Sequence, residues 1–84
     1  MPDNSTRREQ FTATDAIAIT TSDTVDLPVI PRALYVGGAG DISVVTAAGR
    51  TVVIYGAVAG SVIPLQVQRV NATGTTATNL LGLL

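Results

Sequence analysis

The chain has 84 residues, a net charge of −1, and no cysteine or histidine. A chain of this length forms one domain with a thin core, and it can have no disulfide and no thiolate or imidazole metal site. Its five basic residues are scattered arginines, so it lacks the cationic cluster that nucleic-acid binding requires.

Residues 1–15 are polar and charged, and Phe11 is their only large apolar side chain after the initiator methionine. They show no strand or helix period, and they lack the apolar core of a secretory leader. They are either a frayed terminus or an extended arm that orders on a neighbouring subunit with Phe11 as its anchor. Fully extended, they would reach about 50 Å. We therefore expect an N-terminal arm over residues 1–15 and a single β domain over residues 16–84.

The segment after the arm predicts short strands broken by turns. Ile17 and Ile19 alternate within residues 16–21, which is typical of a strand. Ser22-Asp23 is a turn signal, because both side chains can bond their own backbone. Residues 24–27 form another candidate strand. Two prolines follow within residues 28–31, which indicates an edge or an extended crossing rather than a central strand.

The chain then re-enters the sheet over residues 32–36, with Leu34 and Val36 toward the core and Tyr35 on the other face. A glycine-rich loop follows, GGAGD at residues 37–41. We expect a tight turn with positive φ at one or more glycines. A phosphate-binding loop would open a helix, whereas the β-branched residues that follow predict a strand.

Residues 42–55 predict a hairpin with a three-residue loop, residues 47–49, in which Gly49 takes the left-handed position. In this register Ile42 faces Ile54 and Val44 faces Val52, all on one side of the ribbon. The other side carries no charge. Its members are Ser43, Val45, Thr51, Val53 and Tyr55.

The last third of the chain predicts one further strand and an apolar end. Residues 56–60 read as a turn or a weak strand end. Apolar residues then alternate with polar ones over residues 61–69, which predicts one strand with a solvent-exposed face. Arg69 is expected on the core side at its end, where it could snorkel or pair with an aspartate. After a loop at residues 71–76, the leucine-rich residues 77–84 should complete the sheet or dock on a neighbour.

No window of eleven residues shows a helical stripe. We therefore predict an all-β fold, a small antiparallel β-sandwich or barrel of six to eight short strands with an extended N-terminal arm. The expected core consists of Leu34, Val36, Ile42, Val44, Val52, Ile54, Ile63, Leu65 and Val67.

Charge is scarce on this chain. Charged residues make up 13% of the sequence, against about 25% in an average globular protein. Either a Thr- and Ser-rich surface keeps the protein soluble, or other subunits cover much of the surface. The uncharged second face of the hairpin favours assembly, because tyrosine offers apolar area together with a polar handle. The residues predicted to contact neighbouring subunits are Phe11, Tyr35, Val45, Val53 and Tyr55.

Catalytic and cofactor sites are not expected. Without histidine, cysteine or lysine there is no base to activate a nucleophile, and the aspartates past residue 15 lie beside turns, where they commonly bond the local backbone. With Ser22 and Thr24, Asp23 and Asp26 could ligate Ca²⁺ through oxygen, although their spacing is not that of an EF-hand loop. A small carbohydrate- or calcium-binding β module is therefore the alternative to an assembly protein.

Three segments resemble a known family. They are TSDTVDLP (residues 21–28), PRALYVGGAGDISVVT (residues 31–46) and RVNATGTTATNLLGLL (residues 69–84). They are similar to the spike base proteins of gene transfer agents and related tailed phages, and ALYVGGAGD and ATGTTATN are the strongest motifs. Leu83-Leu84 stands where the family has a final aromatic residue, and the resemblance covers the arm poorly.

The resemblance implies a virion structural protein on the outer surface of the head, made in the host cytoplasm. Such proteins are vertex spike bases that assemble as rings, bind the major capsid protein and carry a spike fibre. We expect a pentamer more than a trimer, and the charge and residue types described above predict no nucleic acid, membrane or cofactor as a partner. A related role is that of a cement or decoration protein, which braces capsomer junctions.

Overall fold

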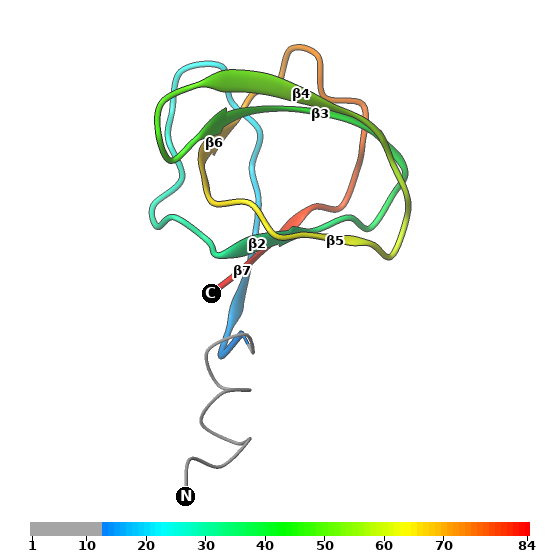
Figure 1. The fold of residues 1–84 in the computed structure, drawn as a ribbon, viewed down its shortest axis with the longest axis horizontal. Helices are drawn as coiled ribbons and strands as arrows, with labels where there is room; N and C mark the ends of the chain where they lie inside the picture. Colours follow the sequence, from blue (N-terminus) through cyan, green and yellow to red (C-terminus); the bar gives the residue numbers. More distant parts are fainter. Residues whose placement is uncertain (1–12) are drawn as a thin grey trace, which may run out of the picture.

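The structure is a computed structural model that describes residues 13–84. Phe11 and most of the expected arm lie outside the described residues. The described part contains seven strands, which Figure 1 shows in two layers. They are β1 (Ala16–Ala18), β2 (Ala33–Tyr35), β3 (Gly40–Thr46), β4 (Thr51–Ala57), β5 (Val62–Ile63), β6 (Val67–Val70) and β7 (Leu81–Leu83).

The strands form two antiparallel sheets that pack as a small sandwich. One sheet has the order β1-β7-β2-β5 and the other the order β4-β3-β6. The prediction of an all-β antiparallel fold with six to eight short strands is therefore confirmed. The leucine-rich end of the chain completes a sheet, because β7 lies between β1 and β2.

The predicted hairpin is present in the predicted register. Ile42 pairs with Ile54, and Val44 pairs with Val52. Thr46 donates its N–H to Arg50 across the three-residue loop, at 2.8 Å. Gly49 has a φ of 92°, the left-handed value that this loop requires and that glycine adopts without steric cost.

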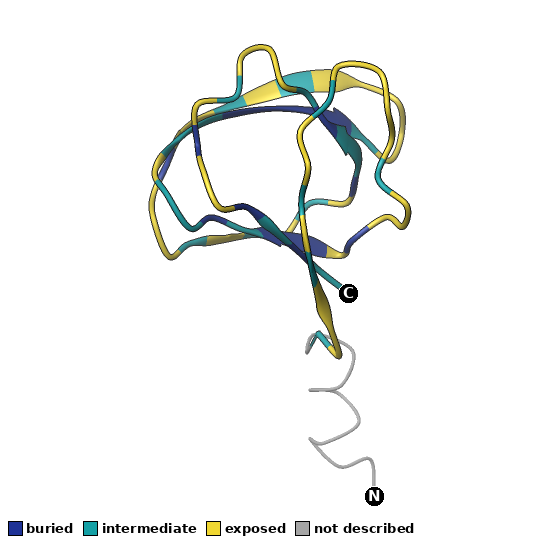
Figure 2. Cartoon of the chain, turned by 180° about the vertical axis from the view of Figure 1, so that it is seen from behind, coloured by how far each residue is buried: buried dark blue, intermediate teal, exposed yellow. Residues whose placement is uncertain are grey.

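The core lies between the two sheets, and the most deeply buried strand residues belong to β2, β3 and β6 (Figure 2). All nine predicted core residues lie in this core or pack against it. Leu34, Val36, Ile42, Val44 and Val67 are fully buried, whereas Val52, Ile54, Ile63 and Leu65 are half-buried. The sequence did not single out the remaining members of the buried cluster, Ala57, Val70, Ala77 and Leu80.

The glycine-rich loop does not form the expected tight turn; its residues 37–38 pack directly against the backbone of residues 78–79, a contact here called the seam. Gly38 forms a two-way bridge with Thr78, with N···O distances of 2.8 and 3.1 Å, and Gly37 donates its N–H to Asn79. A Cβ atom at Gly37 would lie 2.5 Å from the Asn79 carbonyl oxygen, and one at Gly38 would collide with the Thr78 hydroxyl. The glycines at 37 and 38 are therefore needed for close approach of two backbones. Positive φ is found at Gly40 alone in this loop.

The single strand predicted over residues 61–69 is wrong. The chain forms β5 in one sheet, crosses at residues 64–66, and forms β6 in the other sheet. A bulge in β6 then changes the alternation of side chains, because Val45 pairs with Arg69 while Thr46 pairs with Val67. As a result Val67 and Val70 are both fully buried, and Arg69 lies on the outer face instead of the predicted core side.

Residues 24–27 form no strand, contrary to the prediction, but they lie along the free edge of β6. Ser22 donates its N–H to Val70 and Leu27 donates its N–H to Gln68, at 2.9 and 2.8 Å. The extended crossing predicted around the two prolines is present, and Pro31 is among the fully buried side chains.

Candidate assembly surface

The exposed apolar side chains of the described residues fall into two groups. The first group comes from β4, the following turn and β5, and it consists of Val53, Tyr55, Val58 and Val62. Its two members on β4, Val53 and Tyr55, are here called the outer ridge, and Tyr55 is the most exposed, at 78%. The second group comes from residues 25–30, which lie at the left in Figure 1. No charged residue lies between positions 51 and 68 of the sequence, so the segment that carries the ridge is uncharged.

A bulge in β4 positions Tyr55. Gly40 pairs with Ala57 while Ile42 pairs with Ile54, so Tyr55 and Gly56 together lie opposite Asp41. Gly56 has a φ of 69°, and its N–H donates to the Asp41 carboxylate at 3.0 Å. This arrangement returns Ala57 to the buried side and leaves Tyr55 directed outward. A bulge held by a side-chain hydrogen bond is a fixed feature that aims a side chain.

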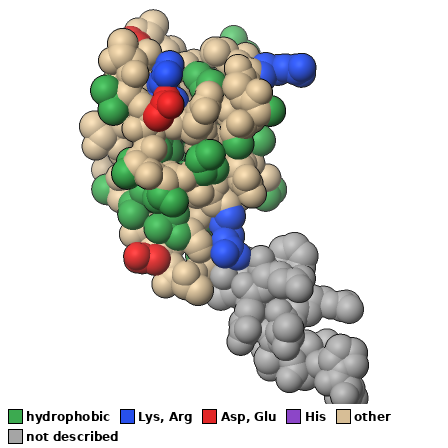
Figure 3. Space-filling model, turned by 90° about the vertical axis from the view of Figure 1, so that its left-hand side faces the viewer, with side chains coloured by type: hydrophobic (Ala, Val, Ile, Leu, Met, Phe, Trp, Pro, Cys, Tyr) green, Lys and Arg blue, Asp and Glu red, His purple; other side chains and the backbone are tan. Residues whose placement is uncertain are grey.

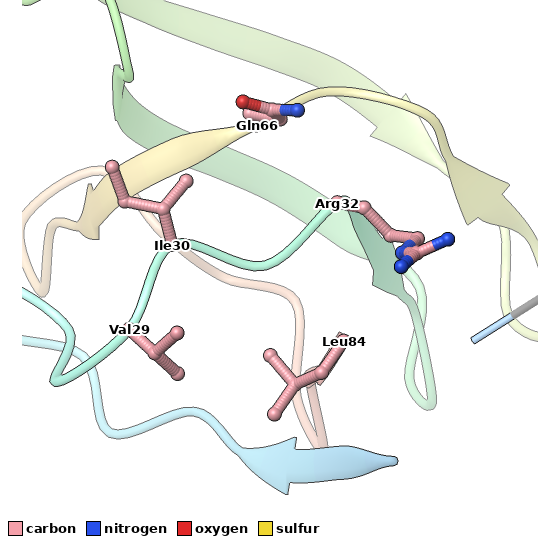
Figure 4. A pocket seen from close by; sticks show the side chains of 5 residues that line it. All are labelled: Val29, Ile30, Arg32, Gln66 and Leu84. Carbon is pink, nitrogen blue, oxygen red and sulfur yellow. The ribbon is translucent and has the colours of Figure 1, made fainter. Parts of the chain in front are cut away.

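Val29 and Ile30 of the second group border a shallow hollow, here called the crossing hollow, whereas Val25 does not line it. Its lining comes from the crossing segment, the β5–β6 connection and the residue after β7, and consists of Val29, Ile30, Arg32, Gln66 and Leu84. Figure 4 shows Val29 and Leu84 pointing toward each other, with Gln66 beyond Ile30. Val29 and Ile30 are nearly half exposed, at 43% and 46%. Figure 3 views this side and shows apolar side chains gathered between charged groups.

The structure separates the five residues predicted to contact neighbours. Phe11 lies outside the described residues. Val53 and Tyr55 are exposed and belong to the outer ridge, and Tyr35 is half-buried on β2. Val45 is only 8% exposed, because it lies on the central strand β3 between Thr51 and Arg69. It can therefore offer a neighbour little area.

The outer face of the three-stranded sheet is partly covered by the chain itself. Ser43 is buried beneath the loop at residues 71–76. Its N–H donates to the Thr75 hydroxyl at 3.0 Å, and its hydroxyl accepts from the Asn71 amide at 3.1 Å. The exposed part of this face is thus its β4 edge, where the ridge lies.

The aspartates considered for calcium bond residues that are distant in sequence instead of their own turn. Asp23 accepts hydrogen bonds from the Thr73 N–H and hydroxyl, at 2.9 and 2.7 Å, and these bonds hold the pKa of Asp23 below its ordinary value. Asp26 forms an ion pair with Arg69 at 2.8 Å, which is the second of the two alternatives expected for Arg69. No cluster of three or more potential metal ligands occurs among residues 13–84.

Prediction from the sequence missed two members of the first exposed group and all of the crossing hollow. Val58 and Val62 were assigned to a turn and a strand, and Val29 and Ile30 to an unspecified crossing. A signal for the hollow was available, because two adjacent β-branched residues between two prolines have no buried strand in which to pack. In the described residues, no helix is long and apolar enough to span a bilayer.

One solved structure matches this fold closely along nearly its whole length. It is the capsid of a native GTA (gene transfer agent) particle, computed with C5 symmetry, and the matching chain gives a TM-score of 0.79. The two chains are 40% identical over 86% of this chain and 83% of the other. No family model and no curated protein matches the sequence. The resemblance is thereby confirmed as far as a gene transfer agent capsid, and the chain belongs to the family of this capsid component.

Proposed function

We propose that this protein is a structural component of the head of a gene transfer agent or tailed phage, and that it serves as a homo-oligomeric vertex spike base. In this role it binds the major capsid protein and carries a spike fibre on the outer surface of the head. The observation that carries the proposal is the relative at 40% identity, whose particle was computed with C5 symmetry.

Fivefold symmetry favours a ring of five copies over a trimer. A cyclic ring needs two different contact surfaces on each copy, because each subunit meets one neighbour on each side. The described residues offer two apolar surfaces at separate places, the outer ridge and the crossing hollow. A monomer with so few charges gains solubility when such surfaces are covered.

The N-terminal residues fit the same role. We assign residues 1–15 to an arm that lies on the shell or on an adjacent copy, with Phe11 as its anchor, and residues 16–84 to the domain that builds the ring. The arm carries charges of both signs and a single large apolar side chain. That composition suits a segment that binds another surface better than one that forms a core of its own.

The first test is the mass of the purified protein at micromolar concentration, measured by light scattering. We expect the mass of an oligomer of five copies of the 8.6 kDa chain. A clean monomer across the concentration range would contradict self-assembly. A mass of three copies would contradict the pentamer and favour a protein that braces capsomer junctions.

The second test is the position of the protein on the assembled head, imaged by electron cryo-microscopy. Density at the fivefold vertices, with a fibre above it, is the expected result. Density at capsomer junctions would identify a cement or decoration protein instead. A sugar- or calcium-binding role would show itself separately in calorimetric titration, as heat that Asp23→Ala or Asp26→Ala abolishes.

A further inference from the structure

Tyr55 lies in the second half of β4, away from the end of the sandwich that carries the crossing hollow. Ala47 donates its N–H to Gln66 at 2.9 Å, so the hollow lies at the end where the β3–β4 hairpin turns. Val58 follows the other end of β4, beyond the pair of Gly40 and Ala57. In Figure 1 the hairpin turn lies at the left of the molecule and the turn after β4 at the right.

A twofold contact in which a surface pairs with the same surface of another copy does not bring the ridge to the hollow. If they meet each other, the contact runs head to tail, and it closes into a ring when the rotation between copies divides the circle. The symmetry of the relative's particle, C5, is of this cyclic kind. The ridge and the hollow therefore meet the topological requirement for the two sides of one contact.

The chemistry of the two surfaces also fits. Tyr55 presents a flat apolar ring that ends in a hydroxyl, and it is the most exposed large apolar side chain of the described residues. The hollow offers Val29, Ile30 and Leu84 to the ring and the Gln66 amide as a partner for the hydroxyl. Buried tyrosines keep a polar partner for the hydroxyl, and they are enriched among the residues that dominate binding energy at interfaces.

We propose that Tyr55 of one copy inserts into the crossing hollow of the next copy, so that each ring contact is a tyrosine held between Val29, Ile30 and Leu84. This inference rests on the proposed ring assembly, and it assigns the two faces of that assembly. The β4 bulge supplies the pre-organisation, because Gly56 and Asp41 fix the direction of Tyr55 before the copies meet.

Cross-linking tests the pairing directly, because the sequence contains no cysteine. The double variant Val53→Cys with Val29→Cys leaves Tyr55 in place and puts one thiol on the ridge and one at the hollow. Treatment with a short bis-maleimide should produce covalent multimers up to the full ring, whereas each single variant should remain a single chain on a denaturing gel. Dimers of Val53→Cys alone would show that ridge meets ridge, and they would overturn the proposal.

Truncation of the tyrosine supplies an independent test. Tyr55→Ala should weaken ring assembly on the order of 30-fold per contact or more, as loss of a dominant interface residue does. Its secondary structure and the melting of the dissociated chain should stay as in the wild type, because Tyr55 is 78% exposed in the single copy. The matched control is Val25→Ala, which removes a side chain that is 66% exposed and lies outside both surfaces.

The outcomes separate this inference from the proposed function. A wild-type chain that stays monomeric overturns the proposed ring, and this contact with it. A ring of the expected mass that shows no cross-link, or whose assembly Tyr55→Ala leaves unchanged, overturns the contact alone.

Discussion

The close contact between residues 37–38 and residues 78–79 gives a sharp prediction for Gly37→Ala. The new Cβ would lie 2.5 Å from the Asn79 carbonyl oxygen and 2.6 Å from the Asn79 Cβ. The neighbour at 2.5 Å is backbone, so the clash is relieved only if the seam opens. Opening it weakens the Gly37–Asn79 bond and the two bonds between Gly38 and Thr78.

The magnitude follows from these losses. Overpacking a tight site costs about 1–3 kcal/mol, and each weakened hydrogen bond about 0.5–1.5 kcal/mol. Together these terms span about 2.5–7.5 kcal/mol, and because the bonds are weakened and not all lost we expect Gly37→Ala to lower the free energy of unfolding by about 3–5 kcal/mol. For a domain of this size that corresponds to a fall in melting temperature of about 12–40 °C. Circular dichroism with thermal and guanidinium unfolding, at one fixed protein concentration, measures both quantities.

Gly60→Ala is the matched control, because it separates close approach from backbone conformation. Gly60 has a φ of 84°, and a Cβ there would meet no atom within 4 Å. Its substitution should cost only the left-handed strain of about 1–2 kcal/mol. If Gly60→Ala proves as damaging as Gly37→Ala, the glycines serve turn geometry alike and the reasoning about the seam is refuted.

Three further predictions concern charge and the core. Because hydrogen bonds from Thr73 lower the pKa of Asp23, its carboxylate stabilises the fold above about pH 4, and this contribution is lost as the pH falls through the lower pKa of the folded state. Asp23→Asn should therefore flatten the pH dependence of the melting temperature below about pH 5, and an unchanged profile would contradict the assignment. Leu34→Ala should lower the free energy of unfolding by about 2–5 kcal/mol, since Leu34 is fully buried; a loss below about 1 kcal/mol in guanidinium unfolding would mean that the core is looser than described. Asp26→Ala should lower the free energy of unfolding by at most about 1 kcal/mol, because the side chains of Asp26 and Arg69 are 52% and 26% exposed. If the loss is as large in high salt as in low salt, the contribution of Asp26 is not a charge attraction, and this prediction is contradicted.

The hairpin could be predicted from sequence because its signals are local. Gly49 at the loop position fixed the register, and the register fixed which side chains share a face. Six of the nine core residues followed from alternation in the same way, whereas Ile63, Leu65 and Val67 lie in or against the core although the single strand predicted for them is wrong. Each of these inferences needs only the residues of one or two adjacent strands.

The remaining features could not be predicted because they depend on partners distant in sequence. The glycines at 37 and 38 are required by residues 78 and 79, and no local pattern reports that contact. The bulge in β6 depends on its pairing with β3, and one unpaired residue there turned Arg69 to the outer face. The apolar alternation over residues 61–69 runs through a change of sheet, which period alone does not reveal.

The candidate surface was predicted in part for the same reason. Tyr55 and Val53 were identified from the uncharged face of the hairpin, and both are exposed. Val45 shares that face but lies on the middle strand, and strand order is not encoded in a local period. The crossing hollow is assembled from three separate stretches of chain, so only the fold could bring them together.

The position of β7 between β1 and β2 bears on when a copy can join a particle. A ribosome must produce nearly all of the domain before the four-stranded layer can close, since the strand in its interior is made after the other three. A prematurely released fragment lacks that strand and leaves β1 without a hydrogen-bonding neighbour. Such fragments cannot present a finished subunit, so only chains that include β7 can form the complete four-stranded layer.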